Sequence, residues 1–439
     1  METPPPTKSK PTPLQVSHVH KAQPPLISAF GKDEQFWWTS TASILARLMN
    51  HCGYNEHDVN AYMALYSQLV LPALGPRPEQ LTNKPFWRSF MTDDFSPIEY
   101  SVNFTSTGRT VRFAIEPISA CAGTSADPFN RIAPEEFLHC ISPLVASGAD
   151  MRMYDHFLGD GDMATHLPHY EHASQVFVGF DLDHGCSDGN LIPKVYLMPS
   201  IRAAATGFTS LDLVSHAIQT LEIPGEGTNT DMVHAWAVVQ GYITSQPAKS
   251  TPQVEMVSFD CVYPRSSRIK IYVRSPHMSL AVAKDMFTLG GRIHLGDEAG
   301  SLESALQNLE DLWNLSLGLA PGTPEDEEVH PRDESHANHR TGGVIFNYEL
   351  RPGQSYPQAQ LYIPVRHYGT IDASVARGLA TFFRRLGWES YANEYASGLE
   401  DIFPRHPLER TTGTQTYISF AYKKDKGAYI SVYYSPRIF

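Results

Sequence analysis

The chain has 439 residues, of which 42% are hydrophobic and 18% charged, and it includes 6 Trp, 21 Tyr and 21 Phe. This composition can build a sizeable core, which excludes a disordered chain, and the length suits one large domain or a few average ones. The 34 Lys and Arg against 47 Asp and Glu give a formal net charge of -13. A general nucleic-acid binder is therefore excluded, because such a protein needs a basic face.

The N-terminal residues 1–27 are rich in Pro, Lys, Ser and Thr, and we predict a flexible Pro-rich arm there. They contain no apolar stretch typical of a secretory signal. The most apolar run, residues 63–74, is too short to cross a bilayer. The five cysteines form no CxxC pair and are most simply reduced thiols. These features predict a cytoplasmic protein without a membrane partner.

Helical periodicity follows the arm, with helices predicted over residues 36–49 and 56–70. From residue 98 onward pairs of short strands alternate with helices, and the order recurs at an interval of roughly 80 residues. The predicted strand pairs are 98–104 with 110–116, 176–182 with 192–198, 255–262 with 268–273, 343–350 with 360–365, and 417–422 with 428–434. Helices are predicted from about 134, over 210–221, 280–287, 302–317 and 373–386, and up to about 403. The short connections within the pairs predict a largely antiparallel sheet.

Charged and tyrosine side chains recur on one face of these strands. In the segment 268–273, Arg, Lys and Tyr alternate with Ile, Ile and Val, so the polar side chains share one face. A sheet that only showed this face to water would usually mix Thr, Ser, Glu and Lys, whereas here a cation plus Tyr is repeated and acidic partners are missing. The same alternation holds for Lys194 with Tyr196, Gln360 with Tyr362, Arg112, and the tyrosines Tyr417, Tyr429 and Tyr433.

If the sheet closes into a barrel with helices outside, these side chains converge in its lumen. Arg112, Lys194, Arg268 and Lys270 would then repel one another, so we expect a multiply charged anion among them. Arg binds phosphate bidentately and Lys acts as a point charge, which together suit a diphosphate. Tyrosine adds a hydroxyl donor and a ring face for a cation. The pattern therefore favours a carbocation that forms beside a diphosphate leaving group.

Several motifs, in order, resemble the fungal dimethylallyltryptophan synthase family of aromatic prenyltransferases. They are DDFSPIEYSVNF, TVRFAIEPI, AGTSADPFN, PKVYL, SRIKIYV, QLYIPV and AYKKDKGAYISVYY. The resemblance implies an α+β fold, the αββα (ABBA) prenyltransferase barrel, with ten antiparallel strands enclosed by a ring of helices over residues 28–439. It also implies transfer of a dimethylallyl group from dimethylallyl diphosphate, the co-substrate, to an indole or similar arene. No further cofactor and no metal are expected, and a homodimer stays open.

The resemblance also assigns roles to residues of this chain. Glu99, in Ser-Pro-Ile-Glu, matches the family glutamate that accepts a hydrogen bond from the indole N–H, which raises electron density on the ring. The diphosphate-binding set implied is Arg112, Lys194, Arg268, Lys270, Gln360 and Tyr417. The tyrosines expected to shield the allyl cation are Tyr196, Tyr272, Tyr362 and Tyr433, and the acceptor is expected to contact Met91, Glu99, Ala114 and Met198.

Two positions depart from the family members that use free tryptophan. Glu255 lies thirteen residues before Arg268, where those members carry an Arg for the substrate carboxylate. A carboxylate facing a carboxylate is disfavoured. Met198 replaces a further shielding Tyr, and Ala114 is small enough to suit a bulky acceptor. We therefore predict a tryptophan-containing cyclic dipeptide or a derived indole alkaloid of secondary metabolism as acceptor, with free tryptophan, tyrosine or a polycyclic phenol as alternatives.

Other functions are less consistent with these residues. Asp93-Asp94 is followed by Phe-Ser-Pro, so the DDxxD motif of magnesium-dependent isoprenyl synthases is absent. A non-catalytic binder of an anionic metabolite remains the alternative of another class, although storage needs neither Glu99 nor a tyrosine cage. Two histidine groups are predicted to be surface residues rather than metal ligands, namely His166, His169 and His172, and His330, His336 and His339.

Overall fold

The structure is a computed structural model of the whole chain. It describes residues 30–439 apart from 80–81, 145–147, 160–172, 186–190, 224–226, 294–300, 334–338, 340 and 424–425. The predicted arm, residues 1–27, and the histidines His166, His169, His172 and His336 lie outside the described residues. None of the helices in the described part is long and apolar enough to cross a membrane.

Ten antiparallel strands form a closed barrel, as the sequence predicted. In barrel order they are β1, β12, β11, β10, β9, β8, β7, β4, β3 and β2, and β2 pairs with β1. Their bounds are β1 Ile98–Thr105, β2 Gly108–Ile115, β3 Val176–Leu182, β4 Lys194–Leu197, β7 Gln253–Asp260, β8 Ile269–Arg274, β9 Ile345–Leu350, β10 Gln358–Ile363, β11 Gln415–Lys423 and β12 Gly427–Tyr434. The first and last strands close the barrel through pairs such as Tyr100 with Tyr434.

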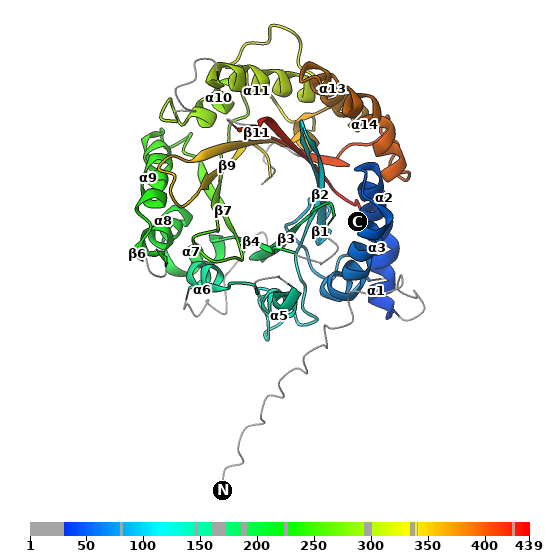
Figure 1. Cartoon of the computed structure of the whole chain (residues 1–439). Coiled ribbons are helices and arrows are strands. Elements are labelled where there is room, and N and C mark those ends of the chain that lie inside the picture. The colour runs from blue at the N-terminus through cyan, green and yellow to red at the C-terminus, as the bar shows by residue number, and fades with distance from the viewer. Residues whose placement is uncertain are drawn as a thin grey trace.

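Helices surround the barrel on its outside (Figure 1). The N-terminal part holds α1 Lys32–Trp37, α2 Ser43–His51, α3 Glu56–Leu65 and α4 Leu71–Ala73, with π-helical turns at Trp38–Ala42 and Tyr66–Val70 between them. Further along lie α5 Ile132–Ile141, a 3₁₀ turn Ser142–Leu144, α6 Arg152–Leu158, α7 Ser200–Thr206, α8 Ser210–Thr220 and α9 Thr230–Ser245. The last ones are α10 Leu280–Thr288, α11 Ser301–Leu317, α12 Val365–Tyr368, α13 Asp372–Arg385 and α14 Glu389–Ile402. A small separate hairpin joins β5 Glu222–Ile223 to β6 Gly227–Thr228.

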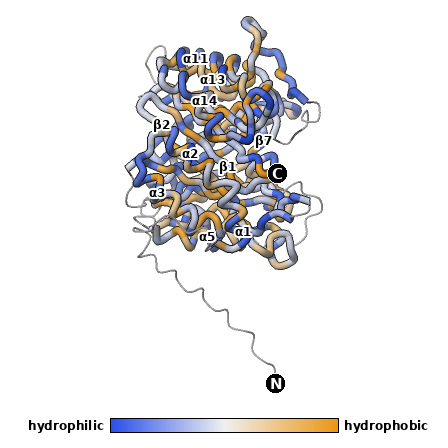
Figure 2. Tube along the Cα trace, turned by 90° about the vertical axis from the view of Figure 1, so that its right-hand side faces the viewer, coloured by the Kyte–Doolittle hydropathy of each residue, from blue (hydrophilic) through white to orange (hydrophobic). Residues whose placement is uncertain are grey.

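The two faces of each strand explain this arrangement. On β8, Ile269, Ile271 and Val273 are fully buried between the sheet and the helices, while Lys270 and Tyr272 point to the lumen. The outer helices are amphipathic, and polar and apolar residues interleave along them (Figure 2). Burial of the apolar strand face against apolar helix faces stabilises the wall, at about 25 cal/mol per Å² of apolar surface removed from water. The polar strand faces are thereby left to line the interior.

The predicted strands and most helices are present within a few residues of their expected bounds, whereas α6, α7, α9 and the four-residue α12 were missed. The buried residues of α9, such as Trp236 and Val239, lie on one side of the helix, but apolar residues off that side, such as Val233 and Val238, are only partly buried and blur the helical period in the sequence. Helices α6 and α7 have seven residues each, too few to establish a period.

Candidate active site

The lumen contains two adjoining compartments, one polar and one apolar. The polar compartment holds all four cations singled out from the sequence and, in addition, Lys423. Strand alternation brings them together, because successive inward positions of β2, β4, β8 and β11 lie at similar depth in the barrel. Its lining includes Arg112, Lys194, Arg268, Lys270, Gln358, Gln360, Lys423 and Tyr429. The predicted convergence of these cations is thus what the structure shows.

The expected lack of acidic partners was wrong. Each of three cations lies directly across from a carboxylate on the neighbouring strand: Arg112 opposite Asp181, Lys194 opposite Asp260, and Lys270 opposite Glu349. The Nζ of Lys270 lies 3.5 Å from Oε2 of Glu349, and Arg268 Nε lies 3.0 Å from Oδ2 of Asp260. Cross-strand pairs of opposite charge stabilise a sheet, so the cation cluster does not depend on a bound anion for its stability.

Burial changes the ionisation of these groups. Burial and the neighbouring cations Arg268, Lys194 and Arg112 together lower the pKa of Lys270 to about 7, against the opposing effect of Glu349. Burial alone would raise the pKa of Glu349, but Lys270, Arg268 and Arg351 hold it at about 2. Glu349 therefore stays ionised at neutral pH, whereas Lys270 is poised to take up a proton when an anion enters.

Four tyrosines form the boundary between the compartments. Tyr196, Tyr272, Tyr362 and Tyr433 line both of them, and we call these four residues the tyrosine belt. Their ring centroids follow one another at 6.2, 5.8 and 5.7 Å. The belt residues come from β4, β8, β10 and β12. A planar cation that left the polar compartment would meet aromatic faces at once, which is an arrangement that stabilises positive charge.

The apolar compartment brings together the predicted acceptor residues. Met91, Glu99, Ala114 and Met198 all line it, and Ala114 lies directly across from Glu99 on the neighbouring strand. The Oε1 of Glu99 accepts a hydrogen bond of 2.9 Å from the Thr416 hydroxyl. Burial outweighs this hydrogen bond and raises the pKa of Glu99 to about 8.

Tyr417 lies in a different place from the one the diphosphate role requires. Its side chain lines the apolar compartment, and its hydroxyl donates to the carbonyl oxygen of Thr341 at 3.2 Å. A register shift in β11 between Gln415 and Ile418 changes which residues face inward at this end of the strand. The alternation of inward and outward residues along β11 therefore did not predict where the Tyr417 hydroxyl lies.

Sequence reasoning missed several functional groups of the apolar compartment. Arg274 is the last residue of β8 and, like Tyr272, lines the apolar compartment. Its Nε lies 3.4 Å from Oε1 of Glu255. Because Arg274 follows Tyr272 by two residues, strand alternation could have predicted that both side chains face the lumen. Asp93 and Thr341 line the compartment from loops, where no period marks them. His339 is half-buried and approaches His367, with ring centroids 4.6 Å apart, so its prediction as a surface histidine was wrong.

Comparison with known proteins agrees with this architecture. The family model of tryptophan dimethylallyltransferase matches residues 33–397. A 7-dimethylallyltryptophan synthase of Aspergillus fumigatus is 39% identical over 422 residues, which are 92% of this chain and 85% of the relative. A 4-O-dimethylallyl-L-tyrosine synthase of Claviceps purpurea is 33% identical, over 92% of this chain and 88% of the relative. The crystal structure of NotF in complex with brevianamide F and DMSPP superposes with a TM-score of 0.77 at 28% identity, covering 92% of this chain and 95% of NotF.

The closed barrel with its ring of helices is an ABBA barrel, and the fold and the relatives together make the protein an aromatic prenyltransferase. More particularly, the chain belongs to the tryptophan dimethylallyltransferase family. Its co-substrate is dimethylallyl diphosphate.

Proposed function

We propose that the protein transfers the dimethylallyl group to the indole ring of a tryptophan-type acceptor inside this barrel. The diphosphate occupies the polar compartment and the indole occupies the apolar one. The observation that carries this proposal is the tyrosine belt, because its four rings border both compartments at the place where the two substrates would meet. Glu99 lies on the indole side and the cation cluster on the diphosphate side.

The reaction begins with ionisation of the co-substrate. The C–O bond to the diphosphate breaks, and its electron pair stays on the leaving group, whose growing charge meets preorganised cations such as Arg112 and Arg268. The allyl cation then faces the belt, where each ring contributes roughly 0.5–2 kcal/mol. Arg112 is itself held near the belt, with its guanidinium 5.8 Å from the Tyr433 ring centroid. The site thus separates the two charges that ionisation creates.

Glu99 holds the acceptor for attack on this cation. A carboxylate that accepts the indole N–H raises electron density on the ring as the electrophile approaches. Because the pKa of Glu99 is raised to about 8 by burial, the carboxyl carries a proton for most of the time at neutral pH, when its carbonyl oxygen can still accept the N–H. The contact is stronger when Glu99 is ionised, since a charged acceptor makes a stronger hydrogen bond.

We favour L-tryptophan as the acceptor. The sequence-based argument against it was the negative charge of Glu255, but Arg274 lies beside that residue and lines the same compartment. The side chain of Arg274 is 11% exposed, and its Nη1 donates to the carbonyl oxygen of Gly342 at 2.9 Å. An arginine and a glutamate side by side complement the carboxylate and ammonium groups of a free amino acid. The 39% identical relative is likewise named for tryptophan.

A tryptophan-containing cyclic dipeptide is the second candidate. Ala114 and Met198 both line the apolar compartment and leave room beside the indole site. An acceptor without free charges would leave the Glu255–Arg274 pair intact. The structural similarity to NotF, whose crystal holds brevianamide F, supports this candidate at 28% identity.

Competing acceptors distinguish these candidates. The protein is incubated with dimethylallyl diphosphate and either L-tryptophan, tryptamine, a tryptophan cyclic dipeptide, L-tyrosine or a polycyclic phenol, and products are detected by mass spectrometry. We expect prenylated L-tryptophan, and a much smaller yield from tryptamine, which lacks the carboxylate. In Arg274→Met the preference for L-tryptophan over tryptamine should disappear. Exclusive prenylation of the cyclic dipeptide, unaffected by Arg274→Met, would show that the second candidate is correct.

A further inference from the structure

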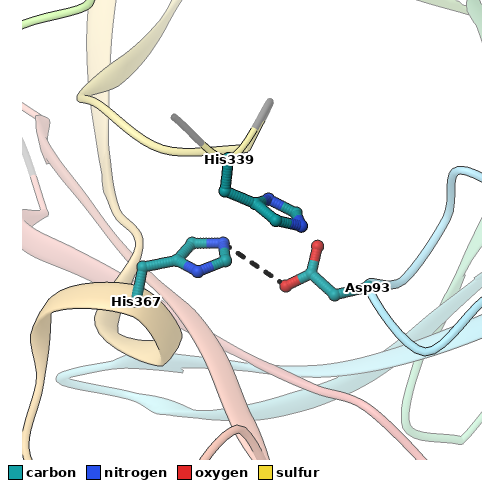
Figure 3. Close-up of side chains that lie close together, drawn as sticks. All are labelled: Asp93, His339 and His367. Atoms are coloured by element: carbon teal, nitrogen blue, oxygen red, sulfur yellow. Dashed lines mark ion pairs between the residues drawn. The ribbon is translucent and has the colours of Figure 1, made fainter. Parts of the chain in front are cut away.

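Three side chains, Thr341, His339 and His367, form a cluster with one carboxylate of the apolar compartment. Asp93 lines this compartment from the loop that precedes β1. Figure 3 shows its carboxylate facing His339 and His367, which come from the loop before β9 and from α12. The hydroxyl of Thr341 lies among the three: it donates to Asp93 Oδ1 at 3.1 Å and lies 2.8 Å from His339 Nδ1 and 2.6 Å from His367 Nε2.

The contacts of Asp93 favour a proton site over a metal site. Its Oδ2 forms an ion pair with Arg366 Nε at 2.5 Å and lies 3.4 Å from His367 Nε2. A guanidinium that already neutralises the carboxylate repels a metal cation. The Thr341 hydroxyl contacts the carboxylate and both imidazoles, so a metal bound here would compete with these contacts. The three potential ligands are therefore arranged as a hydrogen-bonded chain.

Prenylation of an aromatic ring needs such a group. After the ring carbon has bonded to the allyl cation, it still carries its hydrogen, and the ring is a strongly acidic cation. Among the residues that the structure describes, three carboxylates line the apolar compartment, namely Asp93, Glu99 and Glu255. Glu99 is assigned to the indole N–H, and Glu255 is paired with Arg274. Asp93 is also ion-paired, with Arg366 at its Oδ2, but it differs from the other two because its Oδ1 contacts a hydrogen-bonded chain of Thr341 and His339 that can carry the proton away.

We propose that Asp93 is the catalytic base of the reaction and that Thr341 passes the proton to His339. The C–H bond at the alkylated carbon breaks, its electron pair restores the aromatic ring, and the proton goes to the Asp93 carboxylate. The Thr341 hydroxyl then takes this proton while it gives its own to His339 Nδ1. The backbone N–H of Thr341 points at the same Nδ1, at 3.2 Å, so this nitrogen carries the lone pair that the proton needs. His367 acts as a positioning residue, because its Nε2 orients the hydroxyl.

The charged and titratable groups around Asp93 are consistent with this role. Arg366 Nε lies 2.5 Å from Oδ2 of the carboxylate, which leaves Oδ1 to the Thr341 hydroxyl. Glu99 and Tyr417 act on the same region from the barrel wall. A weakly basic carboxylate suffices here, since the cationic ring is a far stronger acid than any carboxylic acid. What matters is the position of the carboxylate in the apolar compartment.

The test is an isotope effect on the Asp93→Asn variant, and it rests on the proposed function. Wild type is assayed first with L-tryptophan and with the tryptophan cyclic dipeptide. Each acceptor is then used again in a form whose indole ring is deuterated. Because proton loss is fast in wild type, we expect nearly equal turnover with the light and deuterated acceptor. Asp93→Asn should turn over about 100-fold more slowly, as for loss of a general base. It should also show a primary isotope effect, because breakage of the C–H bond becomes rate-limiting.

Controls separate this role from a structural one. Glu255→Gln removes another carboxylate of the same compartment and should leave the ratio of light to deuterated turnover near one. Dimethylallyl diphosphate affinity and the unfolding temperature of Asp93→Asn show whether the fold is intact, and Thr341→Val should give the same isotope effect with a smaller loss of turnover.

Slow turnover of Asp93→Asn without an isotope effect, or full turnover, would overturn the proposal. So would loss of wild-type turnover in EDTA with recovery in zinc, which would make the cluster a metal site. If wild type prenylates neither indole acceptor, the proposed function itself fails, and this inference with it.

Discussion

The two compartments of the barrel are built in different ways. The polar compartment is lined by strand residues, and its cations lie opposite carboxylates in register across neighbouring strands. The apolar compartment combines strand residues such as Glu99 and Arg274 with loop residues such as Asp93 and Thr341. One compartment is therefore set by the repeating geometry of the sheet, and the other depends on how individual loops fold over its end.

This difference suits the two compartments to separate tasks. A diphosphate is the constant partner of the reaction, and a rigid, hydrogen-bonded wall can hold it in one place. Acceptors vary in shape, and loops can change without disturbing the strand register. We therefore expect substitutions in the polar compartment to change co-substrate affinity, and those in the apolar compartment to change turnover and acceptor choice. The variants below test that separation.

The largest effect is expected for Glu99→Gln. The amide keeps the shape of the side chain but cannot become the charged acceptor for the indole N–H, so turnover should fall about 100-fold, the usual scale for loss of one electrostatic catalytic contact. Dimethylallyl diphosphate affinity, measured by calorimetry, should stay close to that of wild type. Thr416→Val, which removes only the hydroxyl that donates to Glu99, is the matched control and should lose much less. A large loss of diphosphate affinity in Glu99→Gln would break the separation of tasks.

Lys270→Ala should show the opposite pattern. Its Nζ would contact the diphosphate, and a charge-assisted hydrogen bond contributes roughly 1.5–3 kcal/mol, or about 10- to 150-fold in affinity. We expect that loss in dimethylallyl diphosphate binding, with acceptor binding little changed. Lys423→Ala removes another cation of the same compartment and shows how much of the loss is specific to position 270. Unchanged affinity in Lys270→Ala would remove this residue from the diphosphate site.

Much of this polar compartment could be predicted from the sequence, because strand alternation is a local rule. The cations and belt tyrosines repeat at every second position, and the structure places them on the lumen side together. Their carboxylate partners could not be predicted in the same way. Asp181 and Glu349 meet their cations through the pairing of separate strands, and strand register is not written in either strand alone.

Strand alternation could not predict the loop residues of the apolar compartment. Along the chain, 248 residues separate Asp93 from Thr341, and 26 separate Thr341 from His367. Asp93 and Thr341 lie in loops, which have no hydrophobic period, and the helix α12 that carries His367 has only four residues, so nothing in the sequence indicates that these three side chains meet. His339 was predicted to lie at the surface for this reason, since its neighbourhood in sequence is an acidic stretch. Only the closed fold brings it next to His367.

The tyrosine belt should show an intermediate effect that belongs to both compartments. In Tyr272→Leu one aromatic face is lost, which weakens cation stabilisation by roughly 0.5–2 kcal/mol, or about 2- to 30-fold in the rate of ionisation. The gap should also admit water, so a larger share of the allyl cation should end as dimethylallyl alcohol. The measurement is the ratio of alcohol to prenylated product. Tyr272→Phe keeps the ring and is the matched control. An unchanged ratio in Tyr272→Leu would mean that this belt tyrosine does not exclude water.

The smallest effect, and the sharpest test of the polar compartment, is proton uptake on co-substrate binding. Burial and neighbouring cations lower the pKa of Lys270 to about 7, so above pH 7 the empty site is increasingly neutral at this position. A bound diphosphate raises that pKa, because it favours the charged ammonium. Binding should therefore take up protons at pH 8, and affinity should fall as pH rises above 7, since the proton must be supplied from solution.

Calorimetry at pH 8 in two buffers with different ionisation enthalpies measures this uptake directly. The apparent binding enthalpy should differ between the buffers for wild type and become nearly equal for Lys270→Met, which keeps the bulk of the side chain without its charge. At pH 6 the difference should also shrink for wild type, because Lys270 is already protonated in the empty site. Equal enthalpies for wild type at pH 8 would mean that Lys270 is fully charged before binding. The carboxylate of Glu349, 3.5 Å away, would then outweigh the combined effect of burial and the three neighbouring cations.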